Sequence, residues 1–223
     1  WKDLENVELT GKRPFKYFIN FPMEAATLNF KNGQIKYIFD DMYANSWQIK
    51  SFLKTVVIDK KEYAEKVNYD IKHSDLSDDF FEIYKGNQFT SLRGILLWAL
   101  VGFLCYVFLN SKKIPTFGAT IFLLLFCSFW FFLNSWLMNY FKVSQNFFIV
   151  KNHNFFWKEK GYKLSDIKEI VFETQGKMPN CLRIITKDFR NKLYPAGTLR
   201  DKTWLELKDK LESYNIRVRN ECI

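Results

Sequence analysis

The residues best suited to chemistry form an acidic cluster ahead of the first long apolar run. Asp75, Asp78, Asp79 and Glu82 supply carboxylates, with His73 nearby, and carboxylate oxygens are typical ligands of Ca²⁺. The cluster lacks the glycine and the alternating ligand positions of a calcium loop. Acidic side chains in the first turn of a helix that leads into the apolar run explain it more simply, because they interact favourably with the helix dipole. We therefore expect neither a metal site nor a cofactor.

Catalytic motifs are missing from the rest of the sequence as well. His73 and His153 are the only histidines, and neither has the spacing of a metal-binding or catalytic motif. No nucleophile elbow, phosphate loop, dinucleotide fingerprint or zinc signature occurs. The cysteines include no C-x-x-C pair and are expected to be reduced structural thiols: Cys105, Cys127, Cys181 and Cys222. We expect no catalytic residue, and an enzyme stays only as an alternative.

Two uncharged runs dominate the middle of the chain, residues 94–111 and 114–141. At about 1.5 Å per residue, an 18-residue helix covers about 27 Å, close to the ~30 Å thickness of the bilayer hydrocarbon. Two buried helices of a soluble protein are the alternative. Residues 122–133, FLLLFCSFWFFL, are apolar on every face, and a chain this small has no core that would surround them. The sequence thus predicts an antiparallel pair of membrane-spanning helices over residues 91–141.

Cations flank these helices unequally. The short link between the runs holds Lys112 and Lys113, whereas six cations lie just outside the runs: Lys85, Arg93, Lys142, Lys151, Lys158 and Lys160. Cytoplasmic flanks carry an excess of Lys and Arg, so we expect both soluble domains on the cytoplasmic side of a bacterial inner membrane. The chain begins at Trp1 rather than Met, and we expect further residues upstream.

Polar and aromatic side chains in the runs predict how the helices pack. We assign packing between helices to Trp98, Gly102, Asn134 and Asn139. Aromatic residues near the end of the second run are expected at the membrane interface, where amphipathic rings collect: Trp136, Tyr140 and Phe141. Neither run contains an acidic or basic residue that would mark an ion pathway.

After residue 141 the apolar pattern changes to short runs separated by turn signals. It predicts an antiparallel meander with strands at about 141–151, 155–163, 167–174, 181–187 and 191–196. A closing helix follows, with Thr203 and Glu206 as a capping box. Its apolar stripe repeats at three and four residues: Trp204, Leu207, Leu211 and Tyr214. We expect a β domain with a C-terminal helix over residues 142–223.

At this point the segment from Phe141 to about Arg219 resembles the bacterial pleckstrin-homology-like domains that are attached to short membrane anchors. The resemblance rests on FKVSQNFFIVKNHNFFWKEKGYKL (141–164), on KLSDIKEIVFE (163–173) and on the closing helix with Trp204. It implies a small barrel that binds lipid, peptide or protein and performs no chemistry. Phosphoinositide-binding members of the wider family place lysines around the first long turn, which implies anionic-headgroup contacts at Lys151, Lys158, Lys160 and Lys163. Glu159 departs from that pattern, and a solvated basic edge facing the lipid is the alternative.

Residues 1–90 carry no recognisable family motif. Asn32-Gly33 lies between two apolar runs, 27–30 and 34–39, which is a strong signal for a β-hairpin. A helix is expected from about residue 42 to Ile58. The segment KRPFKYFINFP (12–22) fits either a strand or an interfacial segment. We expect an N-terminal α+β domain over residues 1–90.

Charge separates the two soluble parts of the chain. Residues 1–90 hold 13 basic and 14 acidic side chains, whereas residues 142–223 hold 17 and 10. The basic excess suits anionic lipid or an acidic partner, and no nucleic-acid-binding motif accompanies it. We expect a non-enzymatic binding or scaffolding protein, an accessory subunit of a larger inner-membrane assembly whose partners are the bilayer and other membrane proteins or further copies of itself. A membrane-resident immunity or inhibitor protein that neutralises a toxin or regulates a transporter is the alternative.

Overall fold

The structure is a computed structural model that describes residues 3–16, 20–63, 80–111, 116–176 and 178–222. Its contacts divide the chain into two compact units. The first unit comprises residues 1–70 and 184–192, and the second comprises residues 71–183 and 193–223. The short segment 184–192 therefore groups with the N-terminal residues although it lies far along the chain.

The first unit contains a four-stranded sheet centred on one long strand. Its strands are β1 (Leu4–Glu8), β2 (Lys12–Lys16), β3 (Asn20–Phe30) and β4 (Ile35–Phe39), and β3 pairs antiparallel with each of the others. The predicted hairpin at Asn32-Gly33 is confirmed, because β3 and β4 flank it and Gly33 has a φ of +79°. The strand interpretation of residues 12–22 also holds where the structure describes them.

Short helices complete the first unit. The 3₁₀ turn η1 (Asp40–Met42) is followed by α1 (Ser46–Phe52), which continues as the π-helical η2 (Leu53–Ile58). This confirms the helix expected to end at Ile58. A small apolar core gathers Leu9, Leu53 and Phe189, and Phe189 comes from the segment 184–192. The α+β expectation is thus met for this unit.

The second unit is built around strands that lie on both sides of the apolar runs in the sequence. Strands β5 (Glu82–Tyr84), β6 (Asn139–Val143), β7 (Phe147–Asn152) and β8 (Glu159–Lys163) form one antiparallel sheet in that order. The 3₁₀ turn η4 (Leu164–Asp166) follows β8. A second sheet has the order β11 (Asn191–Pro195), β10 (Asn180–Thr186), β9 (Ile167–Thr174) and β12 (Arg217–Asn220), with β12 parallel to β9.

Helix α4 (Asp201–Ser213) covers the core of the second unit with the predicted apolar stripe. Trp204 is fully buried, and its ring lies 4.8 Å from Phe172 and 5.7 Å from Phe141. The predicted capping box at Thr203 is wrong, because the helix already begins at Asp201 and Arg200 is its N-cap. Phe141 was expected at a membrane interface but is buried here, because the chain has left the helix and entered β6.

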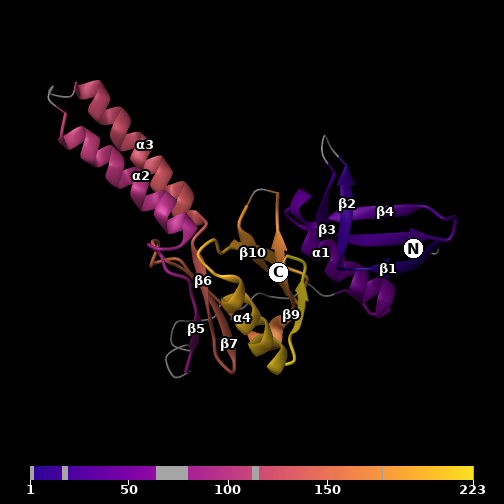
Figure 1. The fold of residues 1–223 in the computed structure, drawn as a ribbon. Helices are drawn as coiled ribbons and strands as arrows, with labels where there is room; N and C mark the ends of the chain where they lie inside the picture. Colours follow the sequence, from indigo (N-terminus) through magenta and orange to yellow (C-terminus); the bar gives the residue numbers. More distant parts are fainter. Residues whose placement is uncertain (1–2, 17–19, 64–79, 112–115, 177, 223) are drawn as a thin grey trace. The chain divides into compact units, whose positions relative to one another are not determined.

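The two apolar runs form α2 (Leu92–Leu109) and α3 (Phe117–Trp136), a pair that we call the apolar hairpin. Both helices are long and apolar enough to cross a membrane. Figure 1 shows them side by side, projecting from the strands of the second unit. The hairpin is an insertion between β5 and β6, two strands that pair with each other, so both of its ends are held by one sheet.

Three strand predictions need correction. The strand expected over 141–151 is two strands, because the chain turns at Ser144 and β6 pairs back onto β7. The strand expected from residue 155 begins only at Glu159. Neither β5 nor β12 was predicted, and the parallel β12 means that the expected antiparallel meander is incomplete.

Candidate functional site at the base of the apolar hairpin

Polar side chains concentrate where α3 ends and the sheets begin. We call this set the hairpin base and define it as Ser135, Asn139, Asn152 and Asn154. The last carbonyl groups of a helix have no partner within the helix and must find donors elsewhere. Here the carbonyl oxygen of Ser135 accepts a hydrogen bond from the side-chain amide of Asn152 in β7, so the end of α3 is fastened to the sheet.

Asn152 is the centre of the hairpin base. Its side chain is buried, and its Nδ2 donates to the carbonyl oxygen of Ser135 at 2.7 Å and to Oδ1 of Asn139 at 3.2 Å. Its Oδ1 accepts from the backbone N–H groups of Asn154 and Phe155, both at 3.0 Å. One amide therefore holds the end of α3 and also shapes the loop that follows β7.

Further hydrogen bonds extend this attachment. Nδ2 of Asn154 donates to Oγ of Ser135 at 2.7 Å, and Nδ2 of Asn139 donates to the carbonyl oxygen of Pro195 at 2.8 Å. The backbone N–H of Gly197 donates to the carbonyl oxygen of Leu137 at 2.9 Å. Residues from β6, β7 and the end of β11 therefore all contact the chain as it leaves α3.

Two glycines allow the segments around the hairpin base to pack closely against each other. A Cβ atom at Gly86 would lie 1.6 Å from the carbonyl oxygen of Thr198, which leaves room for no other residue. A Cβ atom at Gly197 would lie 2.9 Å from Cγ of Arg93. Gly86 and Arg93, on the segment that enters the hairpin, therefore pack closely against residues 197–198. Leu137, on the segment that leaves the hairpin, contacts Gly197 as well.

His153 lies beside the hairpin base in a neutral state. Its Nε2 is 3.2 Å from Oγ1 of Thr198, and its ring centroid is 4.9 Å from that of Tyr140. Burial lowers the pKa of His153 to about 4, and the positive charge of Lys85 acts in the same direction. The imidazole is therefore uncharged at neutral pH, where it packs and accepts or donates one hydrogen bond.

The loop between β7 and β8 carries three consecutive aromatic residues. We call residues 155–158 the aromatic loop. Phe155 is only 3% exposed, and its ring lies 5.6 Å from Phe132 and 6.3 Å from Phe131, both in α3. Phe156 and Trp157 are 78% and 64% exposed. The loop is thus anchored to the last part of α3 by one ring and presents two others to its surroundings.

The lysines assigned to headgroup contact do not all lie together. Nζ of Lys158 is 4.6 Å from the ring centroid of Phe155, so its charge is part of the aromatic loop. Lys151 forms an ion pair with Glu159 at 2.6 Å, and Lys160 is exposed on β8. Lys163 pairs with Phe147 at the other end of β8, several residues away from the hairpin base.

The residues assigned to helix packing have different surroundings. Trp98 faces α3, with its ring 6.2 Å from Phe131. A Cβ atom at Gly102 would meet nothing within 4 Å. Asn134 is buried and donates to the carbonyl oxygen of Trp130 at 2.9 Å, whereas Asn139 lies in β6, beyond the end of α3. Trp130 links the helices as well, because its Nε1 donates to the carbonyl oxygen of Leu96 at 3.2 Å.

Most of the acidic cluster lies outside the described residues: His73, Asp75, Asp78 and Asp79. Glu82 is described, and it belongs to β5 rather than to the first turn of a helix. It forms an ion pair with Lys210 and accepts a hydrogen bond from Tyr84, and the bond to Lys210 is the main cause of its lowered pKa. In the part of the chain that the structure describes, no group of three His, Cys, Asp or Glu residues is placed to hold a metal ion.

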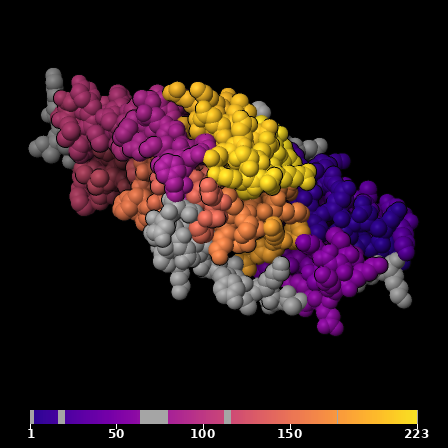
Figure 2. All heavy atoms as spheres, turned by 90° about the horizontal axis from the view of Figure 1, so that it is seen from below, coloured from indigo at the N-terminus to yellow at the C-terminus, as the bar shows by residue number. Residues whose placement is uncertain are grey.

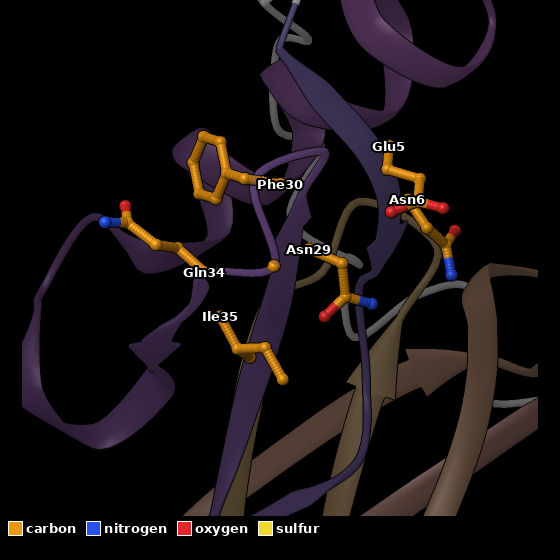
Figure 3. Close-up of a pocket in the computed structure, with 7 residues that line it drawn as sticks. Glu5, Asn6, Asn29, Phe30, Gln34 and Ile35 are labelled. Carbon is orange, nitrogen blue, oxygen red and sulfur yellow. The ribbon is translucent and has the colours of Figure 1, made fainter.

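A shallow recess of about 330 Å³ lies in the first unit, beside the β3–β4 turn. Its lining is mainly amide and apolar, with one carboxylate: Glu5, Asn6, Asn29, Phe30, Gly33, Gln34 and Ile35. The side chains labelled in Figure 3 point in different directions and do not converge on a common point. The recess therefore has no arrangement that would orient a reacting group.

Sequence reasoning missed the role of the hairpin base and of the aromatic loop. Asn152-His153-Asn154 was interpreted only as a break between strands, and residues 155–158 as part of a strand. Three amide or imidazole side chains followed by three aromatic residues were the available signal. No model of a known protein family matches the chain, and no curated protein is similar to it.

Proposed function

We propose that this chain is a membrane-anchored binding protein, an accessory subunit of a larger assembly in a bacterial inner membrane. The observation that carries the proposal is the surface of the apolar hairpin. Only 11% of the span in α2 and 6% of that in α3 is buried by the rest of the chain. An apolar surface of this extent is costly in water and needs lipid or protein around it.

The connections of the hairpin determine on which side of the bilayer its two ends lie. Since β5 and β6 are antiparallel neighbours, the chain leaves and returns to one sheet, and both ends of the hairpin lie on one side of the bilayer. Six flanking cations against two in the link favour the cytoplasm for that side. Both soluble parts are then cytoplasmic.

A binding role for the second unit is supported by its build. Two sheets and a C-terminal amphipathic helix enclose a core around Trp204, which agrees with the proposed pleckstrin-homology-like domain. The charges paired inside this unit are structural, such as the buried Arg183 and Glu173 at 3.0 Å. We propose that the exposed surface of this unit binds a partner and performs no chemistry.

Alkaline carbonate extraction followed by photocrosslinking tests the proposal. The protein is expected to stay in the membrane pellet, and crosslinking residues at the exposed positions Phe103 and Leu125 of the hairpin should trap a defined neighbour in native membranes. The same crosslinking residue in place of Leu205, which is exposed on α4, is the matched control.

Extraction of the protein into the aqueous phase would overturn the membrane anchor. A strictly monomeric protein in mild detergent that traps no neighbour would overturn the accessory role. Protection of cells against a toxin on expression would instead favour the immunity alternative.

A further inference from the structure

The contact between the aromatic loop and α3 determines where the loop lies along the axis of the apolar hairpin. Helix α3 has 20 residues and is about 30 Å long, which matches the ~30 Å hydrocarbon thickness with no residues to spare. Phe132 is four residues before the last residue of α3, about 6 Å from its end. Because Phe155 stacks on Phe132, the aromatic loop lies level with the last turn of α3.

The composition of the aromatic loop fits that level. Trp and other amphipathic rings are favoured at the boundary between hydrocarbon and headgroups, and lysine ammonium groups reach the phosphates there. Phe156 and Trp157 are mainly exposed; their rings lie 4.9 Å apart, and the ring of Trp157 also lies 5.5 Å from that of the buried Phe155. Lys158 lies beside them, against the ring of Phe155.

The exposed rings also continue an apolar surface that is already present. Phe132 is itself 59% exposed on the outer face of α3, next to the buried Phe155. Figure 2 shows the atoms of the hairpin extending beyond the orange and yellow atoms of the strands and α4. A bilayer that surrounds the last turn of α3 therefore also reaches the aromatic loop, without any rearrangement of the second unit.

We propose that Phe156 and Trp157 insert into the headgroup boundary of the leaflet nearest the β-sheets, with Lys158 on a lipid phosphate. The loop then acts as a third membrane contact beside α2 and α3, and fixes the rotation and tilt of the second unit against the bilayer. Asn152 holds this contact in place, because it shapes the loop and fastens α3 at once. The inference rests on the proposed function, since it requires the hairpin to cross the membrane.

Depth-dependent fluorescence quenching tests the inference in proteoliposomes of phosphatidylcholine and phosphatidylglycerol. A full-length variant with all four cysteines replaced by alanine receives one bimane-labelled cysteine, through Trp157→Cys or through Gln145→Cys. Gln145 is an exposed residue in the β6–β7 turn, at the opposite end of those strands from Asn152. Both side chains are mainly exposed; Trp157→Cys removes the 5.5 Å ring contact with Phe155, whose stacking on Phe132 stays in place to anchor the loop.

Nitroxide groups near the headgroups are expected to quench bimane at position 157 and to leave position 145 at its aqueous intensity. A third variant keeps only Cys105, an exposed cysteine within α2. It tests whether the hairpin crosses the bilayer separately from whether the aromatic loop contacts lipid. If nitroxides deep in the acyl chains quench Cys105 but position 157 emits as in water, the aromatic loop is not a lipid contact. If Cys105 is not quenched either, the hairpin is outside the bilayer and the proposed function fails with it. Equal quenching at positions 145 and 157 would also overturn the inference, because no face of the unit would then be singled out.

Discussion

The side-chain amide of Asn152 donates to the carbonyl oxygen of Ser135 at 2.7 Å, which ties the end of α3 to the first sheet. The same residue accepts two backbone N–H groups of the loop that follows. Replacement by alanine leaves several of these buried groups without a partner. A buried hydrogen-bonding group that loses its partner costs about 1–3 kcal/mol, so the structural effect should be large for one side chain.

For Asn152→Ala we expect a lower thermal unfolding midpoint in mild detergent and faster hydrogen exchange at residues 153–158. Asn152→Asp is the sharper variant, because it keeps the acceptor oxygen for the loop but loses the donor to Ser135. Its loop should therefore exchange more slowly than in Asn152→Ala, whereas the end of α3 should be loosened in both. Gln145→Ala, at an exposed turn, is the control and should change neither property. An Asn152→Ala protein as stable as the original would contradict the role of the hairpin base.

His153 predicts a pH dependence of stability. Its folded pKa of about 4 is below the ordinary value of 6.5 because of burial, so the unfolded chain binds the proton more readily. The contribution of His153 to the free energy of unfolding is fully present above the unfolded pKa. It is lost as the pH falls from about 6.5 towards 4, and the free energy of unfolding then falls by at most about 1.4 kcal/mol per pH unit.

Unfolding midpoints between pH 7 and pH 5 should therefore fall in the original protein and stay flatter in His153→Gln. The only other histidine provides the matched control, and His73→Gln should keep the full slope. Equal slopes in all three proteins would show that His153 titrates normally in the folded state.

Sequence patterns predicted those parts of the fold that local chemistry determines. The apolar runs predicted α2 and α3 because length and composition alone decide such helices. The stripe of α4 and the Asn32-Gly33 turn were found for the same reason. Strand β5 was missed because three residues show no usable period, and its partner Val143 lies 61 residues after Glu82. Phe141 was misplaced because the second apolar run continues through the change from α3 to β6.

The hairpin base was beyond the reach of such patterns. Asn152 and Asn154 look like ordinary turn residues, and only the fold brings them to the carbonyl and hydroxyl groups of Ser135. The same holds for Gly86, whose neighbour Thr198 is far along the chain. Contacts between distant segments leave no period in a single sequence.

A buried ion pair in the first unit gives a third prediction. Lys50 of α1 and Asp40 are both buried and paired, and Nδ2 of Asn191 donates to Oδ2 of Asp40 at 2.7 Å. Breaking a buried pair by removing one partner costs about 3–5 kcal/mol, because the other charge stays buried. Lys50→Met should therefore raise the rate of hydrogen exchange across residues 20–58, whereas Lys50→Met combined with Asp40→Asn should restore much of the protection. Lys202→Met, which removes one partner of an exposed pair on α4, should change stability by less than about 0.5 kcal/mol. A double variant no better protected than Lys50→Met alone would contradict the buried-charge explanation.

The orientation of the hairpin gives the last prediction. Ser111 lies just after α2, where the link begins, whereas Cys222 lies in the second unit, which the proposed topology places on the opposite side of the membrane. In a variant without other cysteines, Ser111→Cys should react with an impermeant maleimide in intact cells whose outer membrane has been made permeable, because the link is expected outside the cytoplasm. Cys222, tested as the only cysteine, should react only after the cells are lysed. Labelling of Cys222 but not of position 111 in intact cells would mean the opposite orientation, and labelling of both would mean that the hairpin does not separate the two positions.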